Sequence, residues 1–236
     1  DRTYLGCTSA PARIHRDMKT AQLTHDREAQ AGFSAIARVA SAGGDLSLAS
    51  VFLITWVAPN APLALPLSAA MLAMLLEFIV VHSTAFMGNV ALGQGARGPR
   101  ARAILGLGAF YTLFVGAFAV AFETWQPLIA FWVLTFNRSL GVLLDPLPTA
   151  GQELRVRKSW AAVTMSYLFA VMVTTLLPVP GLGIDGAVVA AAELPSSGLW
   201  VSQPQRVVAA GFLHFALCGL SEFFAHRWIS DRSIPR

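Results

Sequence analysis

The sequence predicts an all-α, multi-pass membrane protein: a bundle of about six transmembrane helices with both termini in the cytoplasm. Of the 236 residues, 55% are hydrophobic and only 13% are charged, and the mean hydropathy is +0.58. This balance lies outside the range of a soluble domain, so we expect lipid to surround most of the chain. The helix count follows from the apolar runs and from the basic residues between them.

Five apolar runs are long enough to cross a bilayer, which requires about 20 mostly apolar residues. A sixth run, 39–58, is weaker because Gly43, Gly44 and Asp45 interrupt it. The five clear runs predict spanning helices at 67–90, 103–123, 127–144, 160–178 and 206–228.

Basic residues decide whether the weaker run crosses the membrane. Clusters of arginine and lysine lie before 39–58, after 67–90, after 127–144 and at the C-terminal end. All these clusters share one side of the membrane only if 39–58 also crosses it. Basic residues concentrate on the cytoplasmic side, so the sequence predicts cytoplasmic termini in an inner (plasma) membrane of the bacterial type.

The chain divides into a polar N-terminal tail at 1–38, a transmembrane domain at 39–228 and a short basic tail at 229–236. Met18 opens a stretch typical of a protein start, so we expect residues 1–17 to be upstream translation or a fragment edge. The net charge of +4 is spread between apolar runs, which does not indicate nucleic-acid binding. The expected partner is the lipid bilayer, and a homo-oligomer or a larger membrane complex stays open.

Two charged residues lie near the centre of predicted spanning helices. Counted from the outer helix ends at about 1.5 Å per residue, Glu77 and Arg138 both come out roughly 15 Å deep. A lone charge there costs at least about 2.5 to 3.5 kcal/mol, so we predict a buried ion pair between them. Such a pair either orders the bundle or forms a proton or substrate site.

The face of Glu77 is expected to contact protein rather than lipid. Small residues, which allow close helix approach, share this face at helical spacing. His82 lies about 140° round the same helix at roughly 100° per residue, so it does not form a local dyad with Glu77. The small residues are Ala70, Ala73, Thr84 and Gly88.

The last predicted helix contains "HFALCGLSEFFAH", in which His214, Cys218, Glu222 and His226 are spaced four apart. Neighbours at this spacing share a helix face. A polar seam between helices is the preferred interpretation of these residues. The alternative is a metal cluster: with His82 from another helix, the first three would form this predicted metal cluster, whose residue types suit zinc or another transition metal. Haem ligation by His82 and His214 also stays open, although their depths, about 22 and 12 Å, do not match.

Three functions remain open at this stage. The preferred one is a transporter or permease for a small molecule or a proton-linked substrate, based on Glu77 with Arg138 and on His82 near Glu222. The second is a membrane-embedded metal or haem enzyme built on the predicted metal cluster. The third is a non-catalytic accessory or assembly subunit, in which polar residues only specify helix packing. No internal repeat or broken helix supports the transporter, and the sequence identifies no substrate or cofactor.

Overall fold

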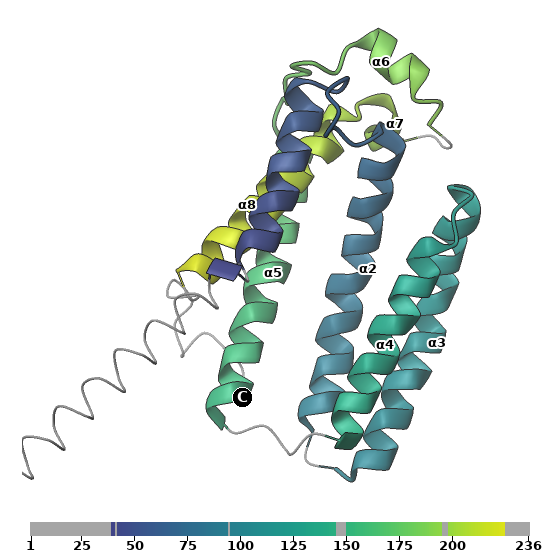
Figure 1. Cartoon of the computed structure of the whole chain (residues 1–236), viewed down its shortest axis with the longest axis vertical. Coiled ribbons are helices and arrows are strands. Elements are labelled where there is room, and N and C mark those ends of the chain that lie inside the picture. Colours follow the sequence, from purple (N-terminus) through teal and green to yellow (C-terminus); the bar gives the residue numbers. More distant parts are fainter. Residues whose placement is uncertain (1–38, 41, 94, 145–149, 195–197, 225–236) are drawn as a thin grey trace, which may run out of the picture.

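The structure is a computed structural model that describes residues 39–40, 42–93, 95–144, 150–194 and 198–224. The predicted tails at 1–38 and 229–236 lie outside these ranges. The described residues form helices and connecting turns, without a strand (Figure 1).

Within the described ranges, five helices are long and apolar enough to cross a membrane, as expected for a helical membrane bundle. Helix Ala42–Val57 is also apolar but shorter, so its crossing stays a prediction. Two short helices lie in the connection between α5 and α8. The labelled helices are α2 (Leu67–Leu92), α3 (Arg97–Ala121), α4 (Gln126–Leu144), α5 (Ala150–Leu176), α6 (Gly186–Ala191), α7 (Leu199–Ser202) and α8 (Gln205–Phe223).

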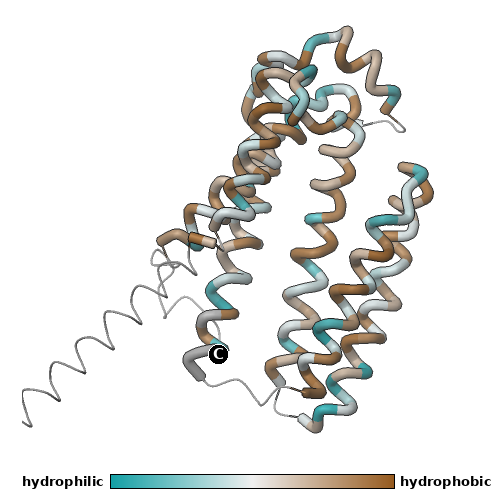
Figure 2. Tube along the Cα trace, in the orientation of Figure 1, coloured by the Kyte–Doolittle hydropathy of each residue, from teal (hydrophilic) through white to brown (hydrophobic). Residues whose placement is uncertain are grey.

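Helix α2 lies between two pairs of helices (Figure 1). On one side α3 packs along α4, and on the other side α5 packs along α8. Figure 2 shows that hydrophobic residues dominate the length of the helices, whereas hydrophilic residues gather towards their ends and in the connections. This distribution of hydrophobic and hydrophilic residues is the one that a bilayer requires. Helix α2 contacts all four helices of the two pairs and so joins them.

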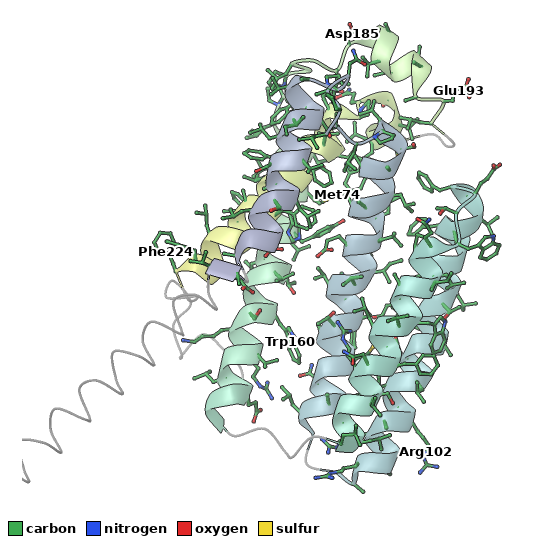
Figure 3. The ribbon with its side chains drawn as sticks, viewed as in Figure 1. Met74, Arg102, Trp160, Asp185, Glu193 and Phe224 are labelled. Carbon is green, nitrogen blue, oxygen red and sulfur yellow. The ribbon has the colours of Figure 1, made fainter. Side chains whose placement is uncertain are left out.

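The prediction that the Glu77 face of α2 contacts protein is confirmed. Ala70 is completely buried, and Gly88 lies so close to the Trp160 ring of α5 that an added Cβ would overlap it. Figure 3 shows Trp160 on the lower part of α5. Small residues on α2 therefore allow the close approach of neighbouring helices.

Helix Ala42–Val57 packs tightly on α8 because α8 has glycine at the contact points. A Cβ added at Gly211 would overlap the ring of Phe52, and one added at Gly219 would collide with Leu46. Helix association in lipid depends on such packing, because lipid tails are as apolar as the side chains themselves. The glycines thus fix the shorter helix against the bundle.

Among the described residues, three arginine side chains bind carbonyl groups at helix C-termini. Arg100 donates to two carbonyl oxygens at the end of α2, at 2.6 and 2.9 Å, and is only 8% exposed. Arg206 donates to three carbonyl oxygens at the end of α5, at 2.6, 2.9 and 3.0 Å. Arg97 donates to the Leu143 carbonyl of α4 at 3.4 Å. These carbonyls lack intrahelical partners and carry the negative end of the helix dipole, so a guanidinium stabilises them.

We expect Gly211→Ala to destabilise the protein and Gly116→Ala to stabilise it. Alanine favours a helix over glycine by about 0.5 to 1 kcal/mol, and nothing lies within 4 Å of a Cβ added at Gly116. At Gly211 the new Cβ overlaps the buried Phe52 ring, and such overpacking costs about 1 to 3 kcal/mol. Thermal unfolding of the purified proteins in detergent measures both changes. Stabilisation by both substitutions would contradict the close contact.

Candidate functional site

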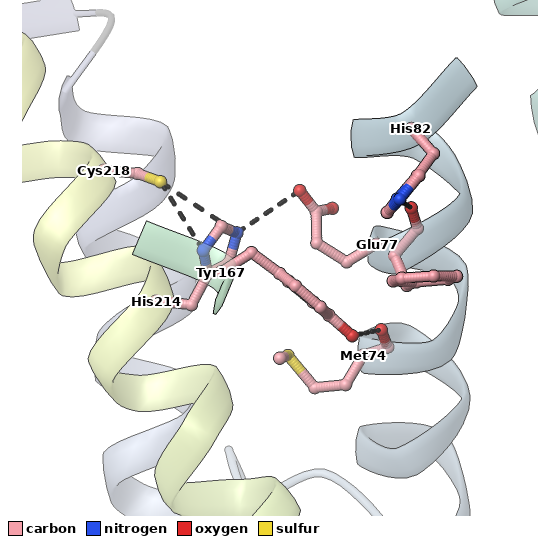
Figure 4. Close-up of polar contacts among 7 residues, drawn as sticks. Met74, Glu77, His82, Tyr167, His214 and Cys218 are labelled. Atoms are coloured by element: carbon pink, nitrogen blue, oxygen red, sulfur yellow. Dashed lines mark hydrogen bonds and ion pairs between the residues drawn. The ribbon is translucent and has the colours of Figure 1, made fainter. Parts of the chain in front are cut away.

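A polar cluster lies inside the bundle where α2 faces α8 (Figure 4). Glu77 Oε1 of α2 is 3.3 Å from His214 Nε2 of α8. Cys218, one turn along α8, places its Sγ 3.8 Å from His214 Nδ1. The His214 side chain is 1% exposed and that of Glu77 is 22% exposed, so water reaches little of this Glu77–His214–Cys218 cluster.

Two residues of α5 close the cluster on one side. The ring of Tyr167 meets the His214 ring edge-on, with centroids 5.4 Å apart. Its hydroxyl donates to the Met74 carbonyl of α2 at 3.0 Å, so Tyr167 also joins α5 to α2. The side chain of the neighbouring Ser166 is buried and interacts with the Cys218 thiol. Each side chain of the cluster is thus positioned by a second helix.

Asp45 is a further polar residue near the cluster, and the sequence interpretation treated it only as an interruption of an apolar run. It is half-buried and interacts electrostatically with Glu222, His214 and Glu77. The close packing of helix Ala42–Val57 on α8 brings it there. The signal was present in the sequence, because an ionisable residue in a membrane helix is by default a candidate functional residue.

The sequence predicts that Glu77 and Arg138 form an ion pair with each other. In the structure Glu77 contacts His214, and Arg138 contacts Thr84. Arg138 Nη2 donates to Thr84 Oγ1 of α2 at 2.6 Å, and its Nη1 lies 3.7 Å from Met87 Sδ. Thr84 lies about two turns beyond Glu77. The depth count set the outer ends of α2 and α4 at one level, whereas Figure 1 shows the α3–α4 turn well below the start of α2. This offset moves Arg138 along α2, away from Glu77.

The structure separates the predicted metal cluster. His82 Nδ1 lies 3.1 Å from the Phe78 carbonyl of its own helix, and the His82 and Phe78 rings are in tilted contact with centroids 4.2 Å apart. Figure 4 shows His82 on α2, on the side away from His214 and Cys218. His214 and Cys218 are adjacent, and Glu222 interacts electrostatically with Cys218. The part of the chain that the structure describes contains no group of three His, Cys, Asp or Glu residues suited to hold a metal ion. His226 lies outside that part.

No protein-family model, curated protein or solved structure matches the chain. The chemistry of the site is therefore argued from its side chains. A neutral His214 can donate Nε2–H to Glu77, and a protonated His214 forms an ion pair with it. The 3.3 Å separation is slightly longer than the usual N–H···O range of about 2.7 to 3.2 Å. The geometry suits a proton that is held between two groups inside the membrane.

We expect Thr84→Val to lower the free energy of unfolding by about 1.5 to 3 kcal/mol, because it removes a hydrogen bond to a half-buried guanidinium. Thr112→Val is the matched control, since the Thr112 hydroxyl donates to the Gly108 carbonyl of its own helix at 2.8 Å. Its expected cost is below about 1 kcal/mol. Chemical or thermal unfolding in detergent compares the two variants. Equal losses would show that Thr84 is not an important partner of Arg138.

Proposed function

We propose that this protein is a proton-linked permease for a small molecule, and that Glu77 and His214 hold the coupling proton. The observation that carries this proposal is the 3.3 Å contact between the two side chains inside the bundle. Ionisable residues within membrane helices are costly, and they commonly mark proton relays and substrate pathways. A carboxylate facing an imidazole is also a pair whose charges change with a single proton.

The position of the pair explains how a proton would act on the bundle. Glu77 belongs to α2, which lies between the two helix pairs, and His214 belongs to α8. Two opposite charges about 4 Å apart attract by about 4 kcal/mol at an effective dielectric constant near 20. In our proposal, protonation of Glu77 removes this attraction and loosens α2 from α8. The proton thereby changes the relative position of the two sides of the molecule.

We also propose that helix Ala42–Val57 crosses the bilayer as a sixth span, with both termini in the cytoplasm. Helix Ala42–Val57 falls only just short of the minimum of about 17 residues for a spanning helix, and residues 39 and 40 are helical as well. The end of the bundle where α2 joins α3 carries Arg97, Arg100 and Arg102, which is typical of the cytoplasmic side. The chain would then lie in a bacterial-type inner membrane.

A non-catalytic assembly subunit is the second candidate. It is favoured by the arginines, because Arg97, Arg100 and Arg138 all bind groups of the protein itself and so have a structural use. In that case Glu77 and His214 would be another polar contact that specifies helix packing. The membrane enzyme has less support, since His82 of the predicted metal cluster contacts Phe78 of its own helix and the described residues contain no group of three His, Cys, Asp or Glu suited to hold a metal ion.

Charge displacement after a pH jump tests the permease on a solid-supported membrane that carries the reconstituted full-length protein. We expect the wild-type protein to give a transient current, because protonation of Glu77 moves charge within the bilayer. Glu77→Gln should abolish this current. Glu123→Gln is the matched control, since Glu123 is exposed in the α3–α4 turn, and it should keep the current.

A full-size current from folded Glu77→Gln protein would refute the proposed role of Glu77. Should Glu77→Gln fail to fold, Glu77→Asp provides the test, because it keeps a carboxyl group and moves it away from His214. The pH at which the Asp variant gives half of its current is expected to differ from that of the wild type. An unchanged midpoint would refute the Glu77–His214 contact as the site of the coupling proton, and the absence of a current in the wild-type protein would favour the assembly subunit.

A further inference from the structure

An apolar groove of about 400 Å³ lies between α5 and α8. Its walls include Phe169 and Leu220, which are 46% and 47% exposed. The polar residues that line it, Ser166 and Ser221, are only 5% and 3% exposed and therefore form its floor. Because both helices are apolar enough to span a membrane, the groove faces the hydrocarbon of the bilayer. Apolar walls over a hydroxyl floor suit a molecule with one apolar and one polar part.

The floor of this α5–α8 groove is connected to the Glu77–His214–Cys218 cluster. Ser166 interacts with the Cys218 thiol, which lies 3.8 Å from His214 Nδ1. His214 is in turn 3.3 Å from Glu77. A molecule on the floor would therefore lie one side chain away from the proposed proton site.

The charges behind the floor favour a cation. Glu77 of α2 and Asp45 of helix Ala42–Val57 both interact electrostatically with Cys218. They give two carboxylates to the one imidazole of His214, so a protonated amine is attracted and a carboxylate is repelled. An ammonium group also has three N–H donors for the serine oxygens.

We propose that the α5–α8 groove binds a lipophilic amine taken up from the bilayer, with its alkyl part along the walls and its ammonium group on the Ser166 and Ser221 floor. The proposal rests on the proposed function and supplies its substrate class. The amine and the coupling proton would neutralise the same carboxylates, so the binding of one disfavours the other. That competition is the basis of proton-for-amine exchange.

A second groove provides an internal control. It lies between α2 and α5, has a volume of about 520 Å³, and is lined by Leu168, which is 51% exposed. Its buried polar residue, Tyr167, already donates its hydroxyl to the Met74 carbonyl. Leu168→Trp and Leu220→Trp thus fill two apolar grooves by the same change at similarly exposed leucines, and of these two only the α5–α8 groove, at Leu220, has a serine floor.

Equilibrium binding of radiolabelled dodecylamine to the full-length protein in lipid nanodiscs tests the site, with empty nanodiscs subtracted. We expect saturable binding that is about tenfold tighter than that of dodecanoic acid or dodecanol. Leu220→Trp should weaken amine binding about tenfold or more, and Leu168→Trp should change it by less than about twofold. Lowering the pH should weaken binding in the wild type, and by less in Glu77→Gln, which keeps only the Asp45 carboxylate of this pair.

Equal binding of the amine, the acid and the alcohol would overturn the proposal, since it would show mere partition into apolar surface. An unchanged affinity in folded Leu220→Trp protein, or an equal loss in Leu168→Trp, would overturn the assignment to this groove. Failure of the two proposals can be told apart. Amine binding without a pH-jump current would refute the permease and keep the site, whereas a current without amine binding would refute only the substrate class.

Discussion

The contact between Glu77 and His214 is the interaction on which the arrangement of the bundle depends. The interior offers no water to a carboxyl group, so Glu77 requires a protein partner, and α8 supplies it. Because α2 lies between the α3–α4 pair and the α5–α8 pair, this one polar contact joins the two sides. Tyr167 reinforces the connection by bonding the Met74 carbonyl while its ring covers His214. In our proposal, a structural contact and a proton site use the same atoms.

The same constraint explains the buried basic residues. A helix in lipid leaves its last carbonyl groups without partners, and Arg100 and Arg206 satisfy them at the ends of α2 and α5. Arg138 is satisfied differently, by the hydroxyl of Thr84 on the neighbouring helix. The cationic side chains thus stabilise individual helix ends and helix contacts.

The helices and the protein-facing side of α2 could be predicted from the sequence, because hydropathy and helical periodicity are local properties. The partner of Glu77 could not, since it depends on the vertical offset between helices. Equal depth counts paired Glu77 with Arg138, but the α3–α4 turn begins lower beside α2 (Figure 1). The place of Asp45 beside the cluster could not be predicted for a related reason. It depends on the packing of helix Ala42–Val57 on α8 at Gly211, which is a tertiary contact and not a local property of the sequence.

The most direct test of the central contact is a double-mutant cycle on thermal or chemical unfolding, with Glu77→Leu, His214→Phe and the double variant of the full-length protein. Each single change leaves a buried polar group without its partner, whereas the double change replaces both by apolar groups. We expect the two single losses to exceed the loss in the double variant by about 1 to 3 kcal/mol. Losses that add to within about 0.5 kcal/mol would show that Glu77 and His214 do not interact.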